Sequence, residues 1–125
     1  MTKGTHAGRA ILIVEKNPVL KAFMVGLVER AGFEAIQAGN ADEAISILER
    51  RSDIALLVTN VVMPGSMDGV ELAHVVDIRW PSIKIIVVSG KHGLSERDLP
   101  RKGLFFAKPY HDEELAFEIR SLIAP

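Results

Sequence analysis

Five short apolar runs alternate with longer segments of helical spacing, and this alternation constrains the fold more than any other feature. The runs are Ala10–Glu15, Phe33–Ala38, Ile54–Thr59, Ile83–Ser89 and Leu104–Ala107. Three of them (AILIV, IALLV and IKIIVV) are almost continuously apolar, which is typical of parallel strands covered on both faces. The repeated strand–helix order therefore predicts an α/β fold with a doubly wound, five-stranded parallel sheet.

The segments between the runs begin with residues that favour helix starts. Asn17-Pro18 is typical of an N-cap followed by proline in the first helical position, and predicts a helix as far as Gly32. Asn40, with a glutamate three residues later, is typical of a capping-box variant. The further helices are expected from Asn40 to about Arg51, from Asp68 to about Trp80, and from Asp112 to near the end of the chain.

Composition limits the classes of function. The 125 residues suit one domain, and 48% hydrophobic with 25% charged residues allows a sizeable core in a soluble chain. The net charge of -1 gives no electrostatic footprint for nucleic acid, and the absence of cysteine excludes a thiolate metal site. No apolar run is long enough to span a membrane, and the start MTKGTHAGR lacks the apolar stretch of a signal peptide. We expect a cytoplasmic protein with a flexible tail over residues 1–9 and one domain over residues 10–125.

Several sequence pieces resemble the response-regulator receiver domains of two-component systems. The pieces are ILIVE in the first strand, MPG and DG after the third, VVSG in the fourth and FFAKPY in the fifth. Their order holds from residue 10 to residue 123, and GSMDG with FFAKPY is similar to single-domain receivers. The resemblance implies a flavodoxin-like (βα)5 fold and a signalling module rather than an enzyme. It also implies a histidine kinase or another signalling protein as partner.

Matched position by position, the resemblance assigns roles to residues at the carboxyl ends of the strands, where ligands of such sheets bind. Asn60 falls on the phosphoacceptor, which is normally an aspartate. Glu15 and Lys16 fall on the acidic pair that holds Mg²⁺, and Val62 falls on the residue whose backbone carbonyl ligates the metal. The switch and phosphate-binding positions fall on Ser89, Phe105 and Lys108.

Two of the three carboxylates that the resemblance implies are missing. The Asn60 amide is a poor nucleophile and cannot carry an acyl phosphate. Glu15, Lys16, Asn60 and Lys108 together have a formal charge of about +1, which disfavours a hard cation that needs oxygen ligands. We therefore expect an atypical receiver with weak or absent Mg²⁺ binding, no cofactor and no phosphorylation.

Three alternatives stay open. Asn60 can be a laboratory replacement of an aspartate in a conventional phospho-receiver, or the alignment at this position can be in error. A small flavodoxin-like enzyme or nucleotide binder is a different class. It is disfavoured because the turn Lys16-Asn17-Pro18 has no glycine to admit a phosphate group.

Two surface segments depart from a regular receiver. Leu94–Gly103 is short for the fourth helix of the family and contains Pro100, so we expect a shortened helix or an irregular, poorly ordered loop. In the last helix, four residues follow the spacing of a core face, whereas Phe117 lies outside it and should be exposed. The core-face residues are Leu115, Ile119, Leu122 and Ile123. The exposed aromatic predicts a homodimer or partner contact through this helix.

Overall fold

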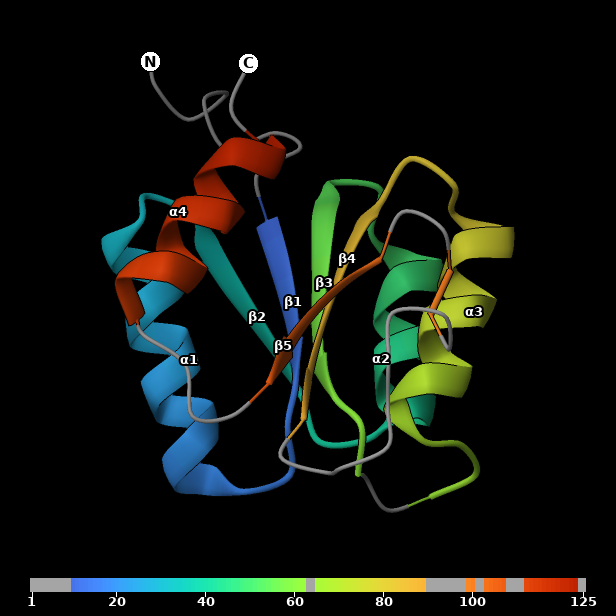
Figure 1. Ribbon diagram of the computed structural model, residues 1–125. Helices are drawn as coiled ribbons and strands as arrows, with labels where there is room; N and C mark the ends of the chain where they lie inside the picture. The colour runs from blue at the N-terminus through green and yellow to red at the C-terminus, as the bar shows by residue number, and fades with distance from the viewer. Residues whose placement is uncertain (1–9, 63–64, 90–98, 101–102, 108–111, 124–125) are drawn as a thin grey trace.

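The computed structural model describes residues 10–62, 65–89, 99–100, 103–107 and 112–123 (Figure 1). Its elements are β1 (Ala10–Val14), α1 (Pro18–Arg30), β2 (Glu34–Ala38), α2 (Ala41–Arg50), β3 (Ile54–Asn60), α3 (Gly69–Arg79), β4 (Lys84–Ser89), β5 (Leu104–Ala107) and α4 (Asp112–Ile123). None of the described helices is long and apolar enough to cross a membrane.

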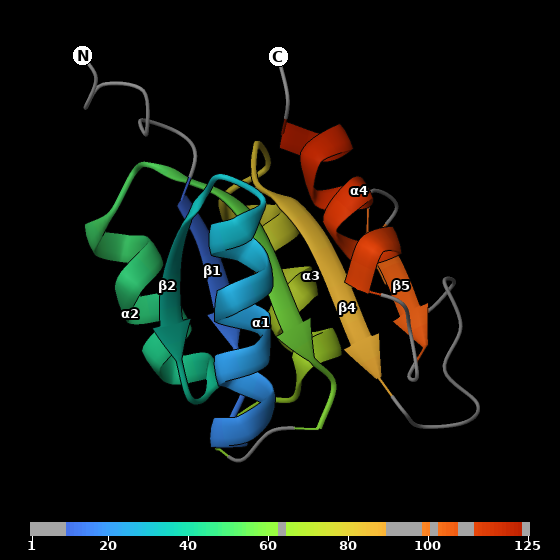
Figure 2. The same cartoon turned by 90° about the vertical axis from the view of Figure 1, so that its left-hand side faces the viewer.

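The five strands form one parallel sheet in the order β2-β1-β3-β4-β5. Helices α1 and α4 cover one face, and α2 and α3 cover the other (Figures 1 and 2). The predicted doubly wound α/β fold is therefore confirmed. Strand β1 lies between β2 and β3, so the direction in which successive strands join the sheet reverses after β2. The carboxyl ends of β1 and β3 therefore flank the topological switch point.

Some observed strand ends differ from the predicted ones by one residue. At the starts of β2 and β4, the reason is that a backbone N–H group bonds outside the sheet. Phe33 was expected in the second strand, but its N–H donates to the Val28 carbonyl at the end of α1. Ile83 was expected in the fourth strand, but its N–H donates to the Trp80 carbonyl in a turn. Glu15 lies just past β1, whereas the third strand extends one residue further than expected and includes Asn60.

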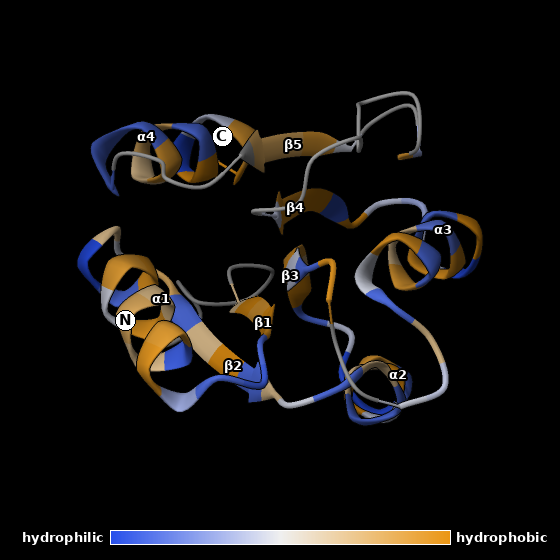
Figure 3. Ribbon diagram, turned by 60° about the horizontal axis from the view of Figure 1, so that its bottom comes forward, coloured by the Kyte–Doolittle hydropathy of each residue, from blue (hydrophilic) through white to orange (hydrophobic). Residues whose placement is uncertain are grey.

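Two clusters of buried apolar side chains, one on each face, enclose the sheet. Figure 3 colours most of the sheet itself as hydrophobic. In β1 the side chains alternate: Leu12 packs with α2 and α3, whereas Ile11 and Ile13 pack with α1 and α4. In β5 the same alternation places Phe105 and Phe106 against opposite layers. Strands buried on both faces explain why the runs are continuously apolar rather than alternating.

Side chains cap the three helices that surround the switch point. The Asn17 Oδ1 atom accepts from the N–H groups of Val19 at 2.9 Å and Leu20 at 3.1 Å, as the Asn-Pro pair predicts. Asp68 and Glu71 form a full capping box at α3. The expected box at α2 is only half formed: Asn40 caps the helix, but the glutamate three residues later accepts from the N–H of Gly39, one residue before the cap.

The segment expected to hold a shortened fourth helix lies mostly outside the described residues. Leu99, Pro100 and Gly103 are described, and none of the three is helical. Leu99 is buried among residues of α2 and α3, and the Gly103 N–H donates to the Pro100 carbonyl at 2.8 Å. The predicted flexible tail over residues 1–9 and the predicted phosphate-binding Lys108 also lie outside the described part.

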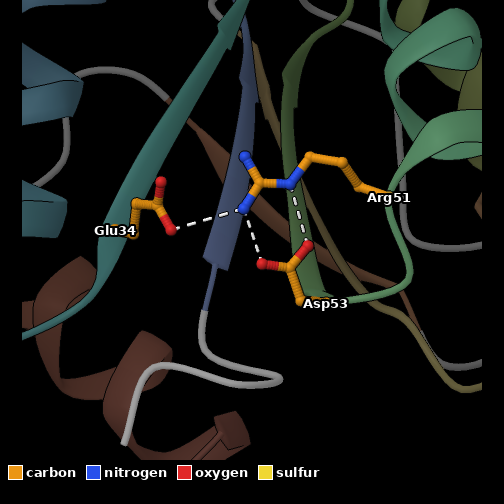
Figure 4. A network of polar contacts seen from close by, with 3 residues as sticks. All are labelled: Glu34, Arg51 and Asp53. Atoms are coloured by element: carbon orange, nitrogen blue, oxygen red, sulfur yellow. Dashed lines mark hydrogen bonds and ion pairs between the residues drawn. The ribbon is translucent and has the colours of Figure 1, made fainter. Parts of the chain in front are cut away.

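At the amino ends of the strands, a polar network joins β2, α2 and β3 (Figure 4). The Arg51 guanidinium donates to both carboxylate oxygens of Asp53, at 2.8 and 2.5 Å, and to Glu34 at 3.4 Å. The hydrogen bond from Arg51 lowers the pKa of Asp53 below its ordinary value. The network lies at the edge of the sheet opposite Asn60 and therefore serves the fold rather than the candidate site.

We expect Arg51→Ala to reduce the free energy of unfolding at pH 7 by about 0.5–1 kcal/mol, because the pair is about one third exposed and screened by solvent. A lowered folded-state pKa of Asp53 stabilises the protein above the unfolded pKa of about 3.9, and the effect is lost as the pH falls through the folded pKa. Urea unfolding should therefore show a wild-type–variant difference that shrinks toward pH 3. Arg50→Ala removes a neighbouring exposed arginine as the matched control, and a difference independent of pH would contradict the expectation.

Candidate functional site

The candidate site lies at the carboxyl ends of β1 and β3, where Asn60 contacts Glu15. The Asn60 Nδ2 atom donates to the Glu15 Oε1 atom at 2.9 Å. A carboxylate can only accept, so the amide must turn its NH₂ group toward Glu15 and its oxygen away. Both side chains are half-buried, which strengthens a charge-assisted hydrogen bond.

The second oxygen of Glu15 connects the site to α1. Its Oε2 atom accepts from the backbone N–H of Asn17 at 2.9 Å, and the Asn17 side chain in turn caps the helix. Glu15 therefore joins the end of β3 to the start of α1 and has a partner for each oxygen. The sequence predicted Asn17 only as a helix cap; its backbone contact with Glu15 was missed.

The backbone of Asn60 is held equally firmly. The hydroxyl of Thr59 donates to the Asn60 carbonyl at 2.9 Å, and the N–H of Val61 donates to the Val88 carbonyl at 3.2 Å. On the α3 side, the N–H of Gly69 donates to the Val61 carbonyl at 2.8 Å. A Cβ atom at Gly69 would overlap the Asn60 carbonyl. The start of α3 therefore lies closer to Asn60 than a residue with a side chain would permit.

The sheet brings the other described candidates to the same edge. Ser89 is buried at the end of β4, one residue beyond the partner of Asn60. Lys16 is exposed and pairs with none of the described residues. Val62 is 57% exposed just after β3, and Phe105 is half-buried on the α2–α3 side. The roles that the resemblance implies for these residues stay predictions.

A cavity of about 20 Å³ lies beneath the bond between Asn60 and Glu15. Apolar side chains of α1, β3 and β4 line most of it, among them Leu20, Met24 and Val88. This volume corresponds to about one water molecule.

The described residues at this edge leave weak or absent Mg²⁺ binding as our expectation. The ion prefers oxygen ligands in octahedral geometry, but Glu15 already accepts two hydrogen bonds and Asn60 presents nitrogen to it. Lys16 adds a positive charge at a position for which the resemblance implies a carboxylate. Within the described ranges, no three His, Asp or Glu side chains are grouped so that they could hold a metal ion.

Solved structures share this fold. A response regulator receiver protein from Sinorhizobium medicae superposes with a TM-score of 0.85 at 22% identity, over 92% of this chain and 94% of that chain. At this level of identity the similarity supports the fold and not a particular activity.

Similar sequences identify the family. The chain is 30% identical over 118 residues to the response regulator receiver protein CpdR of Brucella abortus, covering 92% of this chain and 97% of that protein. It is also 30% identical to the heme response regulator HssR of Staphylococcus saprophyticus, of which it spans only 50%. The family model described as the response regulator receiver domain matches residues 11–120. The chain therefore belongs to the response regulator receiver domain family of two-component signalling.

Proposed function

We propose that this receiver domain acts in two-component signalling through protein contacts and does not accept a phosphoryl group. The observation that carries the proposal is the hydrogen bond from the Asn60 NH₂ group to Glu15, at the position that the resemblance assigns to the phosphoacceptor. Membership of the receiver family supports the signalling role and a histidine kinase or another signalling protein as the partner. We also propose that the protein acts in the cytoplasm and that its role is signalling rather than enzymatic.

The chemistry of the amide supports the absence of phosphorylation. Phosphoryl transfer to a receiver forms a bond from a side-chain oxygen to phosphorus and breaks the bond from phosphorus to the donor. An ionised carboxylate has the negative charge that this attack needs, whereas the Asn60 amide is neutral and delocalised. The charge of Lys16 weakens Mg²⁺ binding in our proposal, so the ion that offsets charge in phosphoryl transfer is lost together with the nucleophile.

The surface of α4 supports a contact with a partner. Leu115 and Ile119 are fully buried and Leu122 and Ile123 pack against the same core layer, as the sequence predicted. Phe117 is 63% exposed, which confirms its predicted position outside the core face. We propose that α4 presents this aromatic either to a second copy of the chain or to another protein.

Incubation with acetyl phosphate and Mg²⁺, followed by intact-mass measurement, tests the proposed lack of phosphorylation. We expect no added phosphate, because the chain lacks a carboxylate at the acceptor position. The double variant Asn60→Asp, Lys16→Asp is the positive control under the same conditions. A base-labile phosphate on Asn60, located by peptide mapping, would overturn the proposal.

A further inference from the structure

An open groove of about 420 Å³ lies between α1 and β2. Figures 1 and 2 both place these two elements side by side, and β2 is the end strand of the sheet, so no described strand lies beyond it. The groove residues that matter below are Lys21, Ala22, Val25, Gly26 and Glu29, all of α1. None of them lines the cavity beneath Asn60, so the groove is separate from the candidate site.

The groove uses a different face of α1 from the one that packs on the sheet. The buried residues of the helix are Met24, Leu27 and Val28. In the groove, Ala22 and Glu29 are exposed and Val25 is half-buried. Positions 22, 25 and 29 are three and four residues apart, so they form one stripe along the helix. A second helix packs along a stripe of this kind.

Gly26 is not explained by the packing of the chain on itself. Glycine destabilises a helix interior relative to alanine. Gly26 does not have a positive φ, and a Cβ atom there would meet only the end of the flexible Arg30 side chain, at 3.2 Å. Together with Ala22, four residues earlier, it leaves the backbone of α1 open at the groove. Another helix can therefore approach α1 closely at this point.

The two charges of the groove are opposite and have no partner in the described part of the chain. Neither Lys21 nor Glu29 forms an ion pair or a side-chain hydrogen bond there. They lie four residues before and four residues after Val25, about 12 Å apart along the helix axis. The groove is therefore apolar at its centre, positive at one end and negative at the other.

Such a surface is complementary to itself. A two-fold axis near Val25 would set a second copy of α1 antiparallel to the first. Val25 would then face Val25 of the second copy, and Lys21 of each chain would lie opposite Glu29 of the other. A parallel arrangement would instead bring like charges together. Opposite charges across an interface fix its orientation and register, so the charges favour the antiparallel pair.

We propose that two copies of this chain associate through the α1–β2 groove, as a two-fold dimer in which the two α1 helices pack antiparallel. The inference goes beyond the proposed function, because it concerns the chain's association with itself and leaves α4 free for another protein. Neither Asn60 nor Phe117 lines the groove. Phosphorylation of the chain, or loss of the contact through α4, would therefore leave the proposed dimer unaffected.

Sedimentation equilibrium of the full chain over a concentration series, with charge reversal at each end of the groove, tests the proposal. We expect the wild type to self-associate. Lys21→Glu and Glu29→Lys should each weaken association about tenfold or more, because each places like charges opposite one another twice. An equal mixture of the two variants should associate again, since each supplies the charge that the other lacks. Lys84→Glu, the same change at an exposed lysine of β4, is the matched control and should have no effect.

Gly26→Leu tests the close approach of the helices separately from the charges. We expect it to weaken association about tenfold or more, because the added side chain holds the two helices apart. Urea unfolding at low protein concentration checks that the monomer still folds.

Three results would overturn the proposed dimer. The first is a wild-type chain that stays monomeric at about 1 mM. The second is a mixture of the two charge variants that fails to associate. The third is self-association that Phe117→Ser abolishes and that charge reversal at Lys21 and Glu29 leaves unchanged, which would assign the contact to α4 instead.

Discussion

Asn60→Asp alone should restore phosphorylation poorly, whereas Asn60→Asp combined with Lys16→Asp should restore it well. In the single variant, a carboxylate replaces the NH₂ group that now donates to Glu15 at 2.9 Å, so two negative groups face each other and need a cation. Lys16 still opposes that cation, although solvent screens much of the repulsion because Lys16 is exposed. We expect half-saturation by Mg²⁺ to need at least about tenfold more Mg²⁺ in the single variant.

Acetyl phosphate labelling of both variants over a Mg²⁺ series measures this difference. Lys16→Asp alone is the matched control, because it restores the acidic pair but leaves the neutral amide of Asn60 as the acceptor. It should bind Mg²⁺ without being labelled. An equal and tight Mg²⁺ response of the single and double variants would show that the Lys16 ammonium lies away from the site.

Gly69→Ala should destabilise the protein by about 3 kcal/mol, at the upper end of what overpacking of a core causes. The added methyl group would overlap the backbone of Asn60 and Val61, which cannot rotate away as a side chain can. The start of α3 would have to move and lose the hydrogen bond from the Gly69 N–H to the Val61 carbonyl, which is 2.8 Å long. Urea unfolding of the wild type and the variant measures the loss.

Gly26→Ala is the matched control within α1. Its added methyl group would meet only the end of the flexible Arg30 side chain, at 3.2 Å. Alanine also favours a helix interior over glycine by about 0.8–1 kcal/mol, so this variant should be as stable as the wild type or more stable. Equal stability of Gly69→Ala and Gly26→Ala would show that α3 can shift without cost, and that the close approach to Asn60 is not needed for folding.

The sequence by itself determined the architecture. Short, continuous apolar runs between helix signals favour strands that are buried on both faces, and caps such as Asn17 and Asp68 mark helix starts through hydrogen bonds to nearby residues. The same local signals separated Phe117 from the buried face of the last helix, since helical periodicity is a property of a few consecutive turns. Element ends were less well predicted, because Phe33 and Ile83 continue an apolar pattern while their N–H groups bond within turns.

Only the tertiary structure determined which residues of the site contact each other. Asn60 and Glu15 are 45 residues apart in the sequence, and they meet because β1 and β3 pair in a register that places Val14 opposite Thr59. No local pattern specifies that register to the residue; the packing of both faces of the sheet does, since a shift by one residue would turn every side chain to the other layer. The close approach of Gly69 to Asn60 likewise depends on how α3 packs on the sheet. The contact between Glu15 and Asn60 joins elements that are distant along the chain, and for that reason the sequence could name these residues but not that they touch.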